Sequence, residues 1–184
     1  MINTNLIAFL THLLALRDPH AKGHSNHVAD LSSTLAKKLG LLSDEIDRLD
    51  FAARIHDIGK IAINDFIINK IGRFTEAEYL MVQYHSVLGS NLIETLGLDP
   101  IIPAIILNHH ENYDGSGYPN KIKGDQIPLE ARIIRITDTY DALTSNRAYH
   151  PAYTHKEAIK IMESEQNHFD VQLLSTFFNL DHKE

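Results

Sequence analysis

Apolar residues recur every three or four positions along almost the whole chain, which is the spacing of one face of an α-helix. Near the N-terminus, apolar residues from Leu6 to Leu14 keep this spacing and stop before the Asp18-Pro19 dipeptide. A helix is therefore predicted over residues 1–16, because proline disfavours helical backbone in the residue before it.

Start and stop signals locate the remaining helices. A stripe from Val28 to Leu39 ends at Gly40, a residue type that often follows a helix. The segments TEAE at 75–78 and THKE at 154–157 are capping boxes, in which the threonine and the glutamate satisfy free backbone N–H groups. Further helices are predicted from Ser43 to Gly59, from Thr75 to about His85, and over 87–96, 100–110, 129–144 and 170–179.

No segment shows sustained alternation of apolar and polar residues, which would indicate strands. The pattern predicts an all-α fold, a compact single-domain helical bundle of about seven or more helices. One long polar loop, 111–127, interrupts it, and loops of this length are usually functional.

Composition narrows the class of protein. The 184 residues are 43% hydrophobic and carry a net charge of −7, which is typical of a single soluble domain, 1–184, and argues against a duplex nucleic-acid surface. No apolar run approaches the roughly 20 residues of a membrane span, so no membrane partner is expected. The chain has no cysteine, which excludes disulfides, thiolate metal sites and a cysteine nucleophile. A cytoplasmic enzyme fits these limits.

Twelve histidines are the unusual feature of this composition. Several histidines and aspartates fall where helices end or where an apolar stripe faces the core, and unpaired polar groups there cost several kcal/mol. Singly, each would be an ordinary surface pair or helix cap, but together they suggest coordination to cations. The candidate ligands are His24, His56, Asp57, His85, His109, His110 and Asp138, with His20 one helical turn before His24.

Imidazole and carboxylate without thiolate suit Fe, Mn, Co, Ni or Zn. Because the candidate ligands outnumber those that one ion needs, two ions sharing a bridging carboxylate are expected, as in many hydrolases. The outer position near His20 is a candidate for a third, weaker ion.

Four segments in this order resemble the HD-GYP domain, a branch of the HD metal-dependent phosphohydrolases. They are HDIGK at 56–60, HHENYDGSGYP at 109–119, IPLEARI at 127–133 and DTYDALTSNRAY at 138–149. The resemblance extends over residues 17–178. It implies a phosphodiesterase that opens cyclic di-GMP to linear pGpG and then to GMP. It also implies two divalent metal ions as cofactors, with iron as the favoured metal.

The same resemblance implies roles for individual residues. All seven candidate ligands match metal ligands of the family, with Asp57 expected to bridge the ions. Asp57 and Lys60 are expected to be catalytic, and the substrate contacts match Lys60, Asp114, Gly117, Tyr118, Pro119 and Arg147. The family often joins this domain to a regulatory domain or protein partner.

Two departures leave other functions open. His150 stands where the family usually has an arginine, and His20 stands where members with three ions carry glutamate. A cyclic dinucleotide sensor or interaction module without turnover is therefore one alternative. A nucleotide phosphohydrolase of the wider HD superfamily is another, although the complete GYP loop favours the cyclic dinucleotide.

Overall fold

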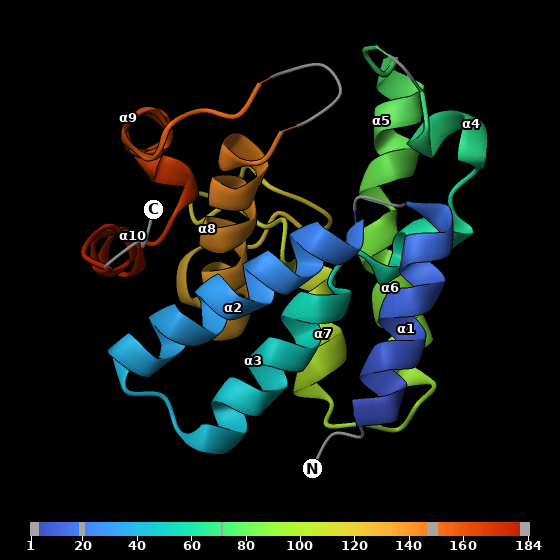
Figure 1. Ribbon diagram of the computed structural model, residues 1–184, viewed down its shortest axis with the longest axis horizontal. Coiled ribbons are helices and arrows are strands. Elements are labelled where there is room, and N and C mark those ends of the chain that lie inside the picture. Colours follow the sequence, from blue (N-terminus) through green and yellow to red (C-terminus); the bar gives the residue numbers. More distant parts are fainter. Residues whose placement is uncertain (1–3, 19–20, 71, 147–150, 181–184) are drawn as a thin grey trace.

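The structure, a computed structural model, describes residues 4–18, 21–70, 72–146 and 151–180. Every regular element in these ranges is a helix, which confirms the all-α fold class (Figure 1). The α-helices are α1 Thr4–Arg17, α2 Ala21–Leu39, α3 Ser43–Ile55, α4 Asp65–Ile68, α5 Glu76–Gln83, α6 His85–Glu94, α7 Ile101–Asn108, α8 Leu129–Thr144, α9 His155–Ser164 and α10 Val171–Phe178. The 3₁₀ helices are η1 Ile58–Ala62, η2 Gly124–Gln126 and η3 Gln166–His168.

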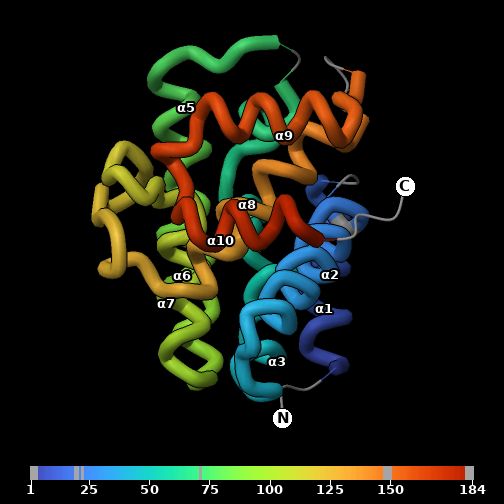
Figure 2. The backbone as a smooth tube through the Cα atoms, turned by 90° about the vertical axis from the view of Figure 1, so that its left-hand side faces the viewer, coloured from blue at the N-terminus to red at the C-terminus, as the bar shows by residue number. Residues whose placement is uncertain are grey.

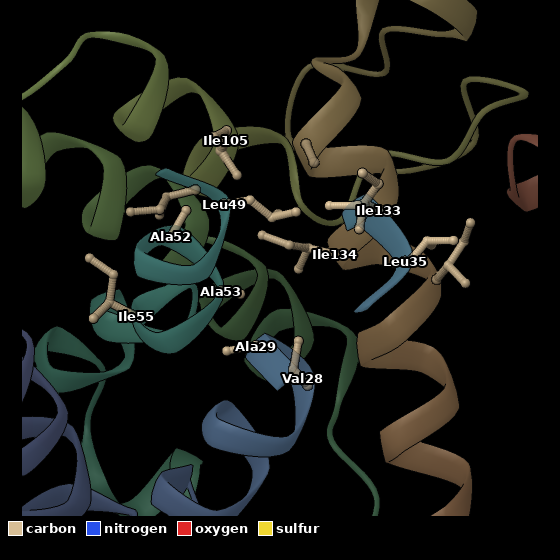
Figure 3. Packing of buried hydrophobic residues seen from close by; sticks show 14 of the residues in the cluster. Val28, Ala29, Leu35, Leu49, Ala52, Ala53, Ile55, Ile105, Ile133 and Ile134 are labelled. Atoms are coloured by element: carbon tan, nitrogen blue, oxygen red, sulfur yellow. The ribbon is translucent and has the colours of Figure 1, made fainter. Parts of the chain in front are cut away.

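The core forms where α2 packs against α3 and α8, with α7 behind α3 (Figure 3). Each helix contributes the apolar stripe seen in its sequence, and burying one Leu or Ile side chain stabilises the fold by about 1.5–3 kcal/mol. Fully buried members of this cluster include Val28, Ala29, Leu35, Leu49, Ala52, Ala53, Ile55, Ile105, Ile133 and Ile134. Helices α9 and α10 pack against α8 on one side of the bundle (Figure 2).

Both predicted capping boxes are present. The Thr75 hydroxyl accepts the N–H of Glu78, whose carboxylate accepts the N–H of Thr75 at 2.7 Å. Thr154 and Glu157 repeat this arrangement at the start of α9. These local signals therefore fix the starts of α5 and α9, and the predicted 129–144 helix agrees with α8.

Two boundaries near the histidines differ from the predictions. The third helix ends at Ile55 instead of Gly59, and the chain continues as η1. The reason is a close crossing, because a Cβ on Gly59 would lie 1.9 Å from the backbone oxygen of His85. The second boundary is at His85, which was expected to end the fourth helix and instead begins α6.

Short elements were also missed, including α4, whose first N–H groups are capped by the Asn64 side chain at 2.9 Å from the N–H of Phe66. No helix in the described part of the chain is both long and apolar enough to cross a membrane.

Candidate metal centre

The candidate ligands come from the ends of several helices and from the core faces of two others. His56 follows α3, His85 begins α6 and His109 follows α7, whereas His24 lies within α2 and Asp138 within α8. The helix packing described above brings these positions together, although they are spread over more than half of the sequence. Sequence spacing alone could not show that they meet.

Three of the histidines are oriented by the helix ends that carry them. In each, Nδ1 lies within hydrogen-bond distance of the backbone oxygen three residues earlier, in the last turn of the preceding helix. The distances are 2.7 Å for His56 to Ala53, 2.6 Å for His85 to Val82 and 2.6 Å for His109 to Ile106. A carbonyl oxygen can only accept, so each Nδ1 carries the proton and each Nε2 is left as a metal-binding acceptor.

Asp57 is the residue that joins the candidate ligands into one centre. It belongs to two groups of potential ligand atoms, one with His85, His109 and His110 and the other with His24 and His56. Its Oδ1 lies 3.2 Å from Nε2 of His85, and its Oδ2 lies 3.4 Å from Nε2 of His56. The carboxylate is therefore shared by both groups, which is the geometry expected of a bridging ligand.

The donor set fits cations. Nε2 of His85 lies 3.2 Å from Nε2 of His109, although both atoms are acceptors when Nδ1 donates to a carbonyl. Burial lowers the pKa of His85, and burial and neighbouring imidazoles lower the pKa of His109 and His110 well below the usual range. Neutral imidazoles with facing lone pairs are suited to divalent cations, which would remove the repulsion between them.

His24 has different surroundings. Its Nε2 lies 3.2 Å from Oδ1 of Asp138, and its Nδ1 lies 2.6 Å from Oδ2 of Asp141. Burial disfavours the charged imidazole, but the hydrogen bonds to both aspartates outweigh this and raise the pKa of His24 to about 10. Asp141 also accepts a hydrogen bond from His27. Asp141 was missed in the sequence; its place one turn after Asp138 in DTYD was the available signal.

Lys60 contacts a candidate ligand. Its Nζ lies 2.6 Å from Oδ2 of Asp57. Burial favours the neutral carboxyl group, but the positive charge of Lys60 and the interactions with His56 and His85 outweigh it and hold the pKa of Asp57 well below its usual range. The lysine thus lies at the edge of the centre, on the carboxylate expected to bridge the ions.

The loop after His110 folds back over the centre. The N–H of Tyr118 donates to the backbone oxygen of His110 at 3.2 Å, and the two rings stack with centroids 4.7 Å apart. A Cβ on Gly117 would lie 2.3 Å from the backbone nitrogen of Asn112, so only glycine fits this crossing. Glu111, another residue missed in the sequence, accepts the N–H of Asn120 at 2.7 Å and fastens the loop.

The other expected substrate residues lie in different places. Asp114 is exposed and accepts both the N–H and the hydroxyl of Ser116, so its carboxylate closes a turn within the loop. Pro119 follows Tyr118 and is half-buried. His20, Arg147 and His150 lie outside the residues that the structure describes.

This arrangement defines an all-helical protein with a cluster of histidines and aspartates between its helix ends that could bind metal ions. The chain belongs to the HD domain family, which matches residues 8–173.

Curated relatives agree with the resemblance found in the sequence. The cyclic di-GMP phosphodiesterase response regulator RpfG of Xanthomonas campestris pv. campestris is 35% identical over 85% of this chain. The 3'3'-cGAMP-specific phosphodiesterase 2 of Vibrio cholerae is 33% identical over 92% of this chain. The match spans 42% of the first protein and 33% of the second, so the chain spans less than half the length of these relatives.

Solved structures share the fold. The HD domain of the phosphodiesterase PgpH of L. monocytogenes, solved in complex with cyclic di-AMP, matches 95% of this chain and 98% of its own, with a TM-score of 0.70 and 19% identity. Bd1817, an HDG"Y"P protein of Bdellovibrio bacteriovorus, matches 86% of this chain and 51% of its own, with a TM-score of 0.69 and 20% identity.

Proposed function

We propose that the chain is a metal-dependent phosphodiesterase that hydrolyses cyclic di-GMP to linear pGpG, and then to GMP. The observation that carries this proposal is the position of Asp57 in both groups of ligand atoms. The relatives that are named cyclic dinucleotide phosphodiesterases support it. His24, His56, His85, His109, His110, Asp57 and Asp138 would hold the ions.

When bound, two divalent cations at these residues supply Lewis acidity toward a phosphodiester and make hydroxide available at neutral pH. Asp57 would keep the two ligand groups at a fixed separation. Lys60 lies beside Asp57 and would present its charge to the phosphate, where negative charge grows during the reaction. Tyr118, stacked on His110, would limit access of water from the loop side.

The identity of the nucleotide is the finer part of the proposal. We favour cyclic di-GMP because relatives from Xanthomonas, Pseudomonas and Thermotoga, at 34–36% identity, carry that activity in their names. The cGAMP-specific relative makes 3'3'-cGAMP the second candidate. Iron is the favoured metal, with manganese, cobalt, nickel and zinc as alternatives.

The test is turnover by protein reconstituted with each metal, with products separated by chromatography. Cyclic di-GMP, 3'3'-cGAMP and guanosine monophosphate are compared, with Asp57→Asn and chelator-treated protein as controls. The proposal expects pGpG from cyclic di-GMP only when metal and Asp57 are both present. Binding of cyclic di-GMP without turnover by metal-loaded protein would overturn it in favour of a sensor, and preferential hydrolysis of the monophosphate would indicate a nucleotide phosphohydrolase.

A further inference from the structure

Arg135 lies on α8 one turn before Asp138, so both side chains leave the same face of the helix. Its Nε donates to Oδ1 of Asn112 at 2.9 Å, and its Nη1 donates to the hydroxyl of Thr139 at 2.5 Å. Asn112 comes two residues after His110. The guanidinium is thus fixed between the segments that carry two candidate metal ligands.

All of these partners are neutral. The remaining contact is with the Phe169 ring, whose centroid lies 5.5 Å from Cζ of Arg135. No carboxylate among the described residues contacts this guanidinium, and its Nη2 has no hydrogen-bond acceptor among them. The position is half-buried, so the positive charge is partly removed from water without a counter-charge.

Among the described residues, the other arginines of comparable burial are paired with carboxylates. Arg132, one turn earlier on α8, contacts Asp125 at 2.9 Å and Asp170 at 2.8 Å. Arg17, Arg48 and Arg54 also contact carboxylates. The chain carries 24 acidic residues and a net charge of −7, so acidic partners are abundant elsewhere. The missing partner at Arg135 therefore indicates a place for an external anion.

The guanidinium also lies within electrostatic range of the centre. Burial is the main reason that the pKa of His110 is lowered, and the charges of neighbouring histidines and of Arg135 act in the same direction. The charge of Arg135 also acts to lower the pKa of Tyr118, against the burial that raises it. Both residues belong to the loop side of the metal centre, so an anion held by Arg135 would lie beside the ions.

We propose that Arg135 binds the phosphate of the cyclic dinucleotide that is not being hydrolysed. This inference rests on the proposed function. A cyclic dinucleotide carries two phosphodiester groups, and the metal centre accounts for one of them. The second keeps its charge throughout the reaction and is matched by a preorganised guanidinium with free Nη2 donors.

Two substrates and three variants test the proposal. Arg135→Gln and Arg135→Lys are compared with Arg48→Gln, which removes a carboxylate-paired arginine. Cyclic di-GMP carries two phosphates, whereas bis(p-nitrophenyl) phosphate carries one. Loss of a charged hydrogen bond to substrate is expected to lower kcat/KM for cyclic di-GMP about 10- to 100-fold in Arg135→Gln, mainly through KM. The kcat/KM of Arg135→Lys for cyclic di-GMP should lie between the values of Arg135→Gln and the wild type.

The single-phosphate substrate gives the decisive comparison. Its kcat/KM should change less than about threefold in Arg135→Gln, with metal content and melting temperature near those of the wild type. An equal loss on both substrates, unchanged kinetics on both, or loss of metal would overturn the proposal, and the last result would make Arg135 a structural link to Asn112.

A failure of the proposed function would be recognised separately, because wild-type protein would then not hydrolyse cyclic di-GMP. Calorimetric binding of cyclic di-GMP to metal-loaded protein would still decide the role of Arg135. At least about tenfold weaker binding by Arg135→Gln, but not by Arg48→Gln, is expected. Equal affinity of the variant and the wild type would overturn the assignment.

Discussion

Oδ2 of Asp141 lies 2.6 Å from Nδ1 of His24, although 117 positions separate the two residues in the chain. The carboxylate holds the imidazole so that Nε2 faces Asp138 and Asp57. Backbone carbonyls orient the imidazoles of His56, His85 and His109 in the same way, by accepting a hydrogen bond from Nδ1. His24 differs because it lies within a helix, where the nearby carbonyls are already bonded, so its orienting group must come from another element.

Asp141→Asn is therefore expected to weaken metal binding about 10- to 100-fold, the usual cost of losing a group that orients a ligand. Competition with a chelator of known affinity measures this. Asp141 also contacts His27, so His27→Ala is the matched control and should bind metal as the wild type does. If His27→Ala weakened binding as much as Asp141→Asn, the aspartate would not be acting through His24.

Gly59→Ala should damage both fold and centre. A Cβ at this position would lie 1.9 Å from the backbone oxygen of His85, so η1 must move away from α6 and Asp57 must move away from His85. A destabilisation of about 3 kcal/mol and reduced metal content are expected, measured by denaturant unfolding and elemental analysis.

Gly23→Ala is the control for this change, because nothing lies within 4 Å of the added atom and the site is inside a helix. Its stability should be unchanged or raised by about 0.5–1 kcal/mol. Equal stability of the two alanine variants would contradict the close crossing of η1 and α6.

The metal-free protein should be most stable near pH 6.5. The lowered pKa values of His85, His109 and His110 contribute stability that is present above the ordinary histidine pKa and is lost as pH falls below it. The raised pKa of His24, about 10, contributes stability that is present below the ordinary pKa and is lost as pH rises toward 10.

Unfolding free energies measured from pH 5 to pH 10 test this dependence. Because folded His24 keeps one proton that the unfolded chain has lost, the unfolding free energy should fall by about 1.4 kcal/mol per pH unit on the alkaline side. His24→Gln should remove the alkaline decrease and keep the acidic one. An alkaline decrease of the same slope in this variant would show that another group is responsible.

The Tyr118 ring, and not its hydroxyl, is expected to matter for the metal centre, because the ring stacks on His110. Tyr118→Phe should keep wild-type metal affinity, whereas Tyr118→Ala should lower it by exposing His110 to water. Metal titrations of both variants measure this. Equal weakening by phenylalanine and alanine would assign the effect to the hydroxyl group.

Local signals account for what the sequence predicted well. The two capping boxes and the apolar stripe of α8 lie within a few residues of the backbone that they organise, and the structure agrees there. The motif resemblance identified the histidines and aspartates of the centre as candidate ligands. The structure places these residues close together, namely His24, His56, Asp57, His85, His109, His110 and Asp138. The roles of Lys60, Asp114 and the GYP tripeptide remain predictions.

The features that were missed depend on distant parts of the chain. Gly59 is a residue type that is common at helix ends, so the sequence placed the end of the third helix there. Only its contact with α6 explains why η1 replaces the last turn of that helix. Asp141 and Arg135 look like surface residues of an amphipathic helix, and the roles proposed for them rest on contacts with α2 and with the loop after His110. Residue spacing carries no information about such pairings.

The central claim is that two ions share the carboxylate of Asp57. Anomalous diffraction from metal-loaded crystals, recorded on both sides of the metal absorption edge, tests it most directly. The account predicts two peaks that both contact Asp57, one beside His24 and His56 and the other beside His85, His109 and His110. A single peak, or two peaks of which only one contacts Asp57, would contradict it.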